Sequence, residues 1–79
     1  MQTVHYRNAQ NVRKECHLTQ DEAATLLGVH YSIISKFEAG KAEMSARLVR
    51  KLAGIYSEIL QRTVSMEELM RDKDLVATP

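Results

Sequence analysis

Apolar residues recur every three or four positions along most of this chain, which is the spacing of one face of an α-helix. The pattern predicts five helices, over residues 4–16, 20–27, 31–39, 46 to 61 or 62, and 66 to 71 or 73. Residue types that favour helices dominate, and one Pro and three Gly leave little material for strands and turns. We therefore expect an all-α domain.

Residues 18–40, LTQDEAATLLGVHYSIISKFEAG, contain two short helical patterns that meet at a tight corner. Thr19 and Glu22 have the spacing of a capping box, in which the threonine hydroxyl accepts from the Glu22 amide and the carboxylate accepts from the Thr19 amide. Gly28 stands where the first helix would end, in the left-handed conformation that glycine adopts at little steric cost. The second helix ends at Gly40. Such a pair can present its second helix outward as a probe.

The second helix of this pair has a narrow apolar face. Ile34 and Phe37 are spaced to face inward. Ile33 points to another side, so it is either an exposed apolar contact or part of a broader buried face. The remaining faces carry Tyr31, Ser32, Ser35 and Lys36.

The segment after Ser45, a good helix cap, predicts the longest helix, because only Gly54 interrupts its pattern. Its apolar residues form two overlapping stripes: Val49, Leu52, Ala53 and Tyr56, and Leu48, Leu52, Ile55 and Ile59. So wide an apolar arc is either packed in the core or is a surface for a partner. Ser65 and Glu68 have the spacing of a second capping box, at the start of the final helix.

The first helix and the last residues are marked less sharply. His17 stands where the first helix should end, and we expect it to be an exposed cap in the left-handed region, which histidine enters more readily than most residues. Residues 74–79 show no pattern, and we expect them to form a flexible tail.

The charge of the chain is balanced overall but uneven along its length. With 79 residues and a net charge of +1, the chain makes one domain, and bulk charge alone does not indicate a nucleic-acid partner. Residues 1–51 hold eight basic and five acidic side chains, a charge of +3, whereas residues 52–79 hold three and five, a charge of −2. Any basic face therefore lies on the first two thirds.

The sequence offers no constellation for catalysis or metal binding. Cys16 is the single cysteine, which excludes an internal disulfide, and it lacks the partner ligands of a zinc site, so we expect a buried or half-buried thiol. The three histidines are too far apart for a helical ligand pair, and neither an HExxH motif nor a glycine-rich phosphate loop is present. We expect no enzyme, no catalytic residue, no metal and no cofactor.

The location of the chain follows from similar reasoning. No apolar run approaches the ~20 residues of a membrane span, and residues 1–10 lack the hydrophobic core of a signal peptide. We expect a protein of a reducing cytosol.

The stretch from 18 to 40 resembles the helix-turn-helix of the Cro/C1-type family, also called lambda repressor-like or Xre, of bacterial and phage transcriptional regulators. The strings that carry the resemblance are LTQDEAATLLGV and ISKFEAGK. With Arg13 in the first helix and residues 45–53 in the fourth, the resemblance covers roughly residues 9–56.

The resemblance implies a five-helix fold whose third helix enters the major groove, in a dimer that reads half-sites ~34 Å apart on a pseudo-palindrome. The domain would span residues 1–73, with the helix-turn-helix at about 19–39. About six residues more than in the family pattern precede the final helix, so we expect a lengthened fourth helix.

The resemblance also implies roles for individual residues. Those expected to contact base edges are Tyr31, Ser32, Ile33, Ser35 and Lys36. Those expected to contact phosphates are Gln20, His30, Lys41, Ser45 and Arg47. Arg13 and Glu38 match a structural ion pair. On physical grounds, a lysine can donate to guanine and an isoleucine can pack on a thymine methyl, and helix N-termini can hold phosphate oxygens.

These observations favour a small sequence-specific transcriptional regulator of phage, plasmid or restriction-modification type, in the bacterial cytoplasm and acting as a homodimer on double-stranded DNA. The alternative is a protein-interaction module or a DNA-binding antitoxin that covers a protein partner with the fourth helix or the C-terminal helix. An enzyme is the weakest hypothesis.

Overall fold

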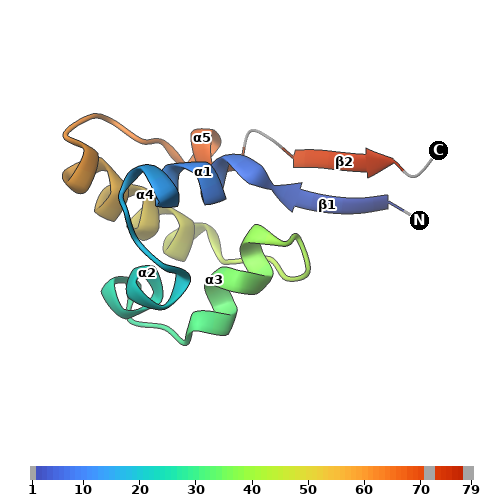
Figure 1. Cartoon of the computed structure of the whole chain (residues 1–79), viewed down its shortest axis with the longest axis horizontal. Coiled ribbons are helices and arrows are strands. Elements are labelled where there is room, and N and C mark those ends of the chain that lie inside the picture. Colours follow the sequence, from blue (N-terminus) through green and yellow to red (C-terminus); the bar gives the residue numbers. More distant parts are fainter. Residues whose placement is uncertain (1, 71–72, 78–79) are drawn as a thin grey trace.

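The computed structural model describes residues 2–70 and 73–77, with side chains from residue 8 to residue 70. Its helices are α1 (Arg7–Glu15), α2 (Gln20–Leu27), α3 (Tyr31–Glu38), α4 (Ala46–Leu60) and α5 (Met66–Met70). The strands β1 (Gln2–Tyr6) and β2 (Lys73–Ala77) form an antiparallel pair. The domain is all-α with five helices, as predicted, and carries this short ribbon beside the helices (Figure 1).

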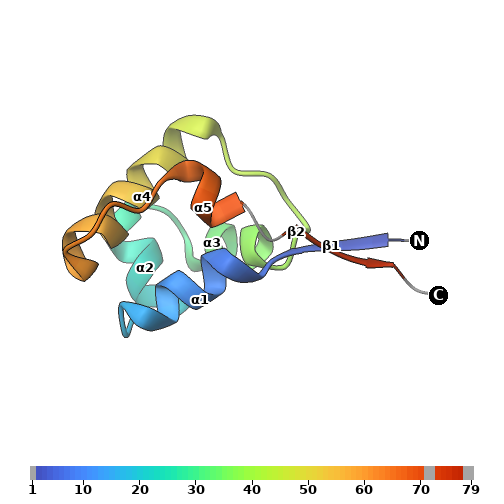
Figure 2. The same cartoon turned by 90° about the horizontal axis from the view of Figure 1, so that it is seen from above.

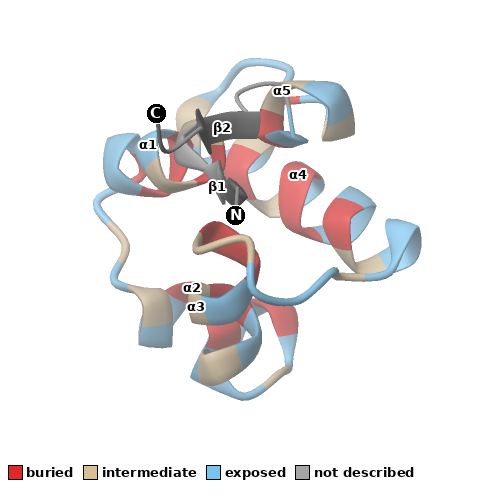
Figure 3. Cartoon of the chain, turned by 90° about the vertical axis from the view of Figure 1, so that its right-hand side faces the viewer, coloured by how far each residue is buried: buried red, intermediate tan, exposed pale blue. Residues whose placement is uncertain are grey.

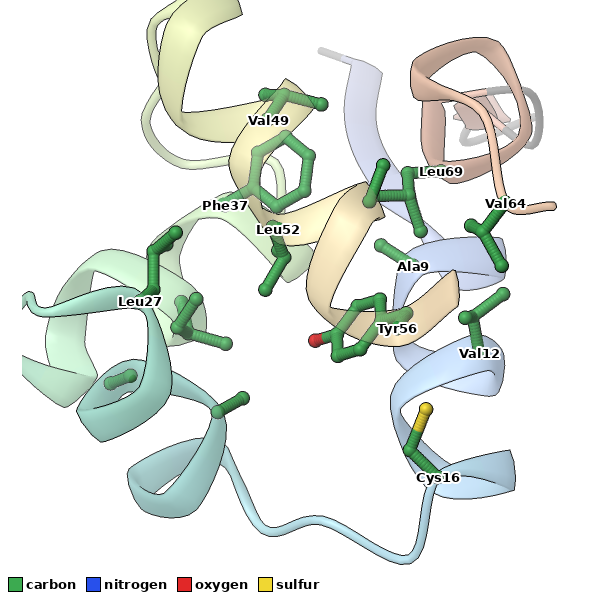
Figure 4. Packing of buried hydrophobic residues seen from close by; sticks show 14 residues of the cluster. Ala9, Val12, Cys16, Leu27, Phe37, Val49, Leu52, Tyr56, Val64 and Leu69 are labelled. Atoms are coloured by element: carbon green, nitrogen blue, oxygen red, sulfur yellow. The ribbon is translucent and has the colours of Figure 1, made fainter. Parts of the chain in front are cut away.

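The helices surround one hydrophobic core. In Figure 1, α2 and α3 lie together below α1, α4 and α5, and the ribbon extends to one side. The buried residues of each helix face the space between these two groups (Figure 3). The largest fully buried side chains, most of them labelled in Figure 4, are Tyr56, Phe37, Leu27, Ile34, Leu52, Leu69, Val12 and Val49.

The ribbon corrects the sequence prediction at both ends of the helical region. The first helix begins at Arg7, not near Val4, because residues 2–6 form β1. Residues 73–77 form β2, whereas we expected residues 74–79 to be a flexible tail, and the register places Val4 opposite Leu75. The backbone hydrogen bonds of each strand are made with a strand from the other end of the described chain, so no local sequence pattern predicts either strand.

Two helices end at residues other than glycine that take the left-handed conformation. At the end of α1, His17 has φ 58°, as predicted, and its amide donates to the Lys14 carbonyl at 2.9 Å. At the end of α4, Gln61 has φ 55°. The fourth helix therefore ends at Leu60, one or two residues earlier than the sequence predicted.

The connection from α4 to α5 is held by the side chain of Ser57. Its hydroxyl donates to the Ala53 carbonyl at 2.7 Å and accepts from the Val64 amide at 2.8 Å. Val64 is buried. The turn after α4 is therefore fixed against the helix, and α5 packs against α1. There the side-chain amide of Asn8 donates to the backbone carbonyl of Glu68.

Candidate nucleic-acid interface

The corner between α2 and α3 has the capping geometry that the sequence predicts. The Glu22 amide donates to the Thr19 hydroxyl at 3.0 Å, and the Thr19 amide donates to the Glu22 carboxylate at 2.9 Å. Gly28 has φ 83°, and the amide of Val29 donates back to Ala24 at 3.0 Å. These bonds satisfy orphan groups at both ends of α2, so α3 starts from a fixed point.

The start of α3 is capped by an imidazole. His30 has an extended backbone, and its Nδ1 accepts from the Ser32 amide at 3.2 Å. The Ser32 hydroxyl lies 2.9 Å from the same nitrogen, and the ring stands 4.8 Å from that of Tyr31. His30 therefore caps α3 in the way that Ser or Thr caps most helices, with Nδ1 as the acceptor.

The side of α3 opposite its buried residues is accessible, with Lys36 exposed and Ser32 half-buried. Ile34 and Phe37 are buried, whereas Ser32 and Lys36 are one helical turn apart on the opposite side. Ile33 is 38% exposed, so of its two interpretations the exposed apolar contact is correct. The five predicted base-contacting residues thus share one accessible helix: Tyr31 (50% exposed), Ile33 and Lys36 are exposed, and Ser32 and Ser35 are half-buried.

The end of α3 is closed by a second glycine corner. Gly40 has φ 72° and its amide donates to Phe37 at 3.0 Å, while the Lys41 amide donates to the Lys36 carbonyl at 2.8 Å. This paired pattern is a Schellman motif, and it places the exposed Lys41 directly after the helix.

The start of α4 is a favourable place for an anion. The Ser45 hydroxyl accepts from the Leu48 amide at 3.2 Å, and the first turn of α4 contains the exposed Arg47 and no acidic residue. The first turn of α2 instead carries Asp21 and Glu22. Because these two carboxylates offset the positive end of the helix dipole, α4 is the better of the two predicted N-terminal phosphate positions.

A buried ion pair ties α1 to α3. The Nε of Arg13 lies 2.7 Å from one Glu38 oxygen and a terminal guanidinium nitrogen lies 3.0 Å from the other. A further guanidinium N–H donates to the Leu18 carbonyl at 2.8 Å. Both residues are 7% exposed. The hydrogen bond to Glu38 raises the pKa of Arg13, so the guanidinium stays charged in this setting.

Gln20 joins the same network. Its amide nitrogen donates to Glu38 at 3.1 Å, which turns the side chain toward the ion pair. One N–H of the Gln20 side-chain amide donates to Glu38, and the second N–H can donate to a phosphate. The predicted contact and the observed hydrogen bond are therefore compatible, and Glu38 orients the amide.

Sequence reasoning missed two features around this interface. Arg50 is exposed and extends the basic side of α4 beyond Arg47; its helical spacing from Arg47 was the available signal. The hydroxyl of Tyr56 is buried without a hydrogen-bond partner, and burial raises the pKa of this phenol. Nothing in the local sequence distinguishes that tyrosine from an ordinary core residue.

The described residues hold no group of three or more His, Cys, Asp or Glu side chains placed to bind a metal ion. No described helix has the length and apolar character that crossing a membrane requires.

A short helix with one accessible face, joined by a tight corner to the helix before it and capped at both ends, defines a helix-turn-helix domain. A family model described as helix-turn-helix matches residues 10–58, more than half of the chain. The chain belongs to this Cro/C1-type helix-turn-helix family, which implies DNA binding. No catalytic family matches. Comparisons with curated proteins and with solved structures gave no match.

Proposed function

We propose that this protein is a sequence-specific transcriptional regulator that binds double-stranded DNA as a homodimer, with α3 in the major groove. The observation that carries the proposal is the outer face of α3, where a lysine and an exposed isoleucine project from a helix whose opposite face is fully buried. An α-helix of this kind fits the width of the major groove.

The residues on this face suit different base edges. Lys36 is a donor for the N7 and O6 acceptors of guanine, and Ile33 offers a methyl surface to thymine. Ser32 and Ser35 carry short hydroxyls that can donate or accept. Tyr31, placed at the first turn, reaches either a base by stacking or a phosphate through its hydroxyl.

The proposed phosphate contacts surround this face. The first turn of α4, at Ser45 and Arg47, and the loop residue Lys41 supply positive charge, while Gln20 and His30 sit at the starts of the two shorter helices. Contacts to phosphates fix the register of the protein on the duplex without reading its sequence.

The cellular setting follows from this function. We place the protein in the cytoplasm of a bacterium, encoded by a phage, a plasmid or a restriction-modification system. Its activity needs no metal, cofactor or catalytic step, so control comes from concentration, dimerisation or a protein partner.

A titration with random-sequence duplex DNA at increasing salt tests the DNA-binding part of the proposal. Phosphate-driven affinity must fall linearly on a double-logarithmic plot, with a slope of about −0.9 for each phosphate contact. Selection of bound sites from a random library then tests specificity, since a recovered palindrome reports sequence preference, symmetry and half-site spacing together. Absence of binding at low salt would reject the proposal.

The alternative function is a protein-interaction module or antitoxin, and one observation favours keeping it. A hollow of about 280 Å³ beside α4 and α5 is lined mainly by apolar side chains, including Met44, Val49, Met66 and Met70. Flexible methionines are common on surfaces that bind other proteins. A chain that ignores DNA at low salt but is protected from proteolysis by a partner would establish this alternative.

A further inference from the structure

The outward face of α4 contains a glycine that its own fold does not need. Gly54 is exposed in the middle of the 15-residue helix, and a Cβ added there would meet nothing within 4 Å. Its φ is not positive, so no turn requires it. Glycine destabilises a helix interior relative to alanine. A residue without a side chain at such a place is useful when another backbone has to come close.

Two opposite charges lie at equal distances on either side of the midpoint between Gly54 and Ile55. Lys51 and Glu58 are exposed, and both are 3.5 positions from the midpoint between Gly54 and Ile55, or about 5 Å along the helix axis. They are about 10 Å apart along one helix, too far to pair with each other. Neither forms an ion pair with any other residue that the structure describes.

This arrangement is self-complementary under a two-fold axis. If a second α4 crosses the first in the antiparallel sense at the midpoint, Lys51 of each copy faces Glu58 of the other, and Ile55 of each copy faces the other's Gly54. Residue i contacting j and j contacting i is the rule for the interface of a two-fold dimer. In Figure 2, α4 runs along one edge of the molecule, so a second copy can reach its outer side.

We infer that this surface, formed by the exposed Lys51, Gly54 and Glu58 and the half-buried Ile55, is the contact of α4 with a second copy of this chain. The inference rests on the homodimer part of the proposed function and names its interface. Ile59, 42% exposed on the flank of the same surface, extends the apolar contact. A contact centred on one helix lies at the small end of specific interfaces, below about 1,200 Å² of total buried area, so the dimer dissociates on dilution.

Charge reversal tests the pairing. Lys51→Glu and Glu58→Lys each place like charges opposite each other at both ends of the contact, and each variant alone should dimerise at least about tenfold more weakly than the wild type. Mixed together, the two variants should form a heterodimer, because every facing pair is then opposite in charge. Native mass spectrometry with one variant isotopically labelled detects that species.

A matched pair of variants on other helices provides the control. Lys14→Glu in α1 and Glu67→Lys in α5 change the same exposed charges away from this surface, and their mixture should show no preference for the heterodimer. Gly54→Gln should raise the melting temperature of the dilute monomer and weaken dimerisation, since the new side chain favours the helix and separates the two backbones.

The outcomes separate this inference from the proposed DNA binding, because the oligomeric state is measured without DNA. A wild-type dimer that is indifferent to both reversals and to Gly54→Gln overturns the interface and leaves DNA binding intact. A wild-type chain that stays monomeric at millimolar concentration also overturns it. Selective heterodimer formation in a chain that fails to bind DNA supports the interface and rejects the regulator.

Discussion

The hydroxyl of Tyr56 is a polar atom that the core accommodates without a partner. Figure 4 shows Tyr56 with the other buried hydrophobic side chains, and the charged groups of Glu38 and Arg13 also lie near its hydroxyl. Burying such a hydroxyl without a hydrogen bond costs roughly 1–3 kcal/mol. We expect Tyr56→Phe, which keeps the ring, to leave the free energy of unfolding unchanged or to raise it by about 1 kcal/mol. Urea denaturation measures this, and a loss above ~1 kcal/mol would reveal a partner for the hydroxyl.

The same phenol gives the domain a dependence on alkaline pH. Burial, with the nearby Glu38 carboxylate, raises the pKa of Tyr56 above its ordinary value of about 10. Because the pKa is raised only in the folded state, the unfolded chain loses the Tyr56 proton first as the pH rises above ~10. The free energy of unfolding is therefore unaffected by this group below pH ~10 and falls above it. The wild type should therefore lose stability above pH ~10 faster than Tyr56→Phe. Parallel curves for the two proteins would contradict this linkage.

The ion pair between Arg13 and Glu38 is the most consequential polar contact in the interior. Removing one partner leaves the other charge buried and poorly compensated, so Arg13→Ala should cost about 3–5 kcal/mol of unfolding free energy. A double-mutant cycle with Glu38→Ala should show strong coupling, whereas the exposed pair of Arg62 and Glu68 is screened by solvent and should couple far more weakly. Equal coupling in the two cycles would mean that burial does not strengthen the inner pair.

At the level of whole helices, residues in the left-handed conformation terminate α1 and α4. His17 and Gln61 hold left-handed conformations that cost an L-residue about 1 kcal/mol relative to glycine. We expect His17→Gly and Gln61→Gly each to raise the unfolding free energy by about 0.5–1 kcal/mol, as calorimetry or denaturation would show. Gly28→Ala should do the opposite. A destabilised His17→Gly would indicate that the imidazole makes a contact worth more than the backbone strain.

These helix ends also show what local sequence can predict. The capping box at Thr19 and the two glycine corners are chemical signals contained within a few residues, and the structure has them where the sequence predicts. Gln61 carries no such signal, because glutamine is a good helix former. The end of α4 depends instead on Ser57 holding Val64, a contact across seven positions that only the folded chain reveals.

At the scale of the whole molecule, the proposed base contacts and the proposed phosphate contacts should affect DNA binding differently. Lys36→Ala should cost about 1–3 kcal/mol on the preferred site and relax its preference at one base pair. Arg47→Ala should weaken binding to all sequences and reduce the salt slope by about 1. Lys14→Ala, exposed on α1, serves as the matched control. If Lys36→Ala weakens all sequences equally, Lys36 contacts phosphate and not a base.

The accessible face of α3 was predictable because the signals that position this helix lie within a few residues of it. The exposed face of α3 follows from its period, and the exposure of Ile33 agrees with one of two predicted alternatives. The orientation of Gln20 toward Glu38 was not predictable, because it depends on a partner eighteen positions away on another helix. The same holds for β1 and β2, whose pairing is wholly non-local.

That non-local pairing sets an order of events when the chain folds. The corner from α2 to α3 closes over a few residues, whereas the ribbon has to bring Gln2 to Ala77. Closing a long loop costs more conformational entropy and slows the contacts that depend on it. A two-stranded ribbon is also only marginally stable by itself in water. We therefore expect the helical body to collapse first and to bring the two strands within reach, so that the β1–β2 ribbon is the last part of the fold to form and the first to open.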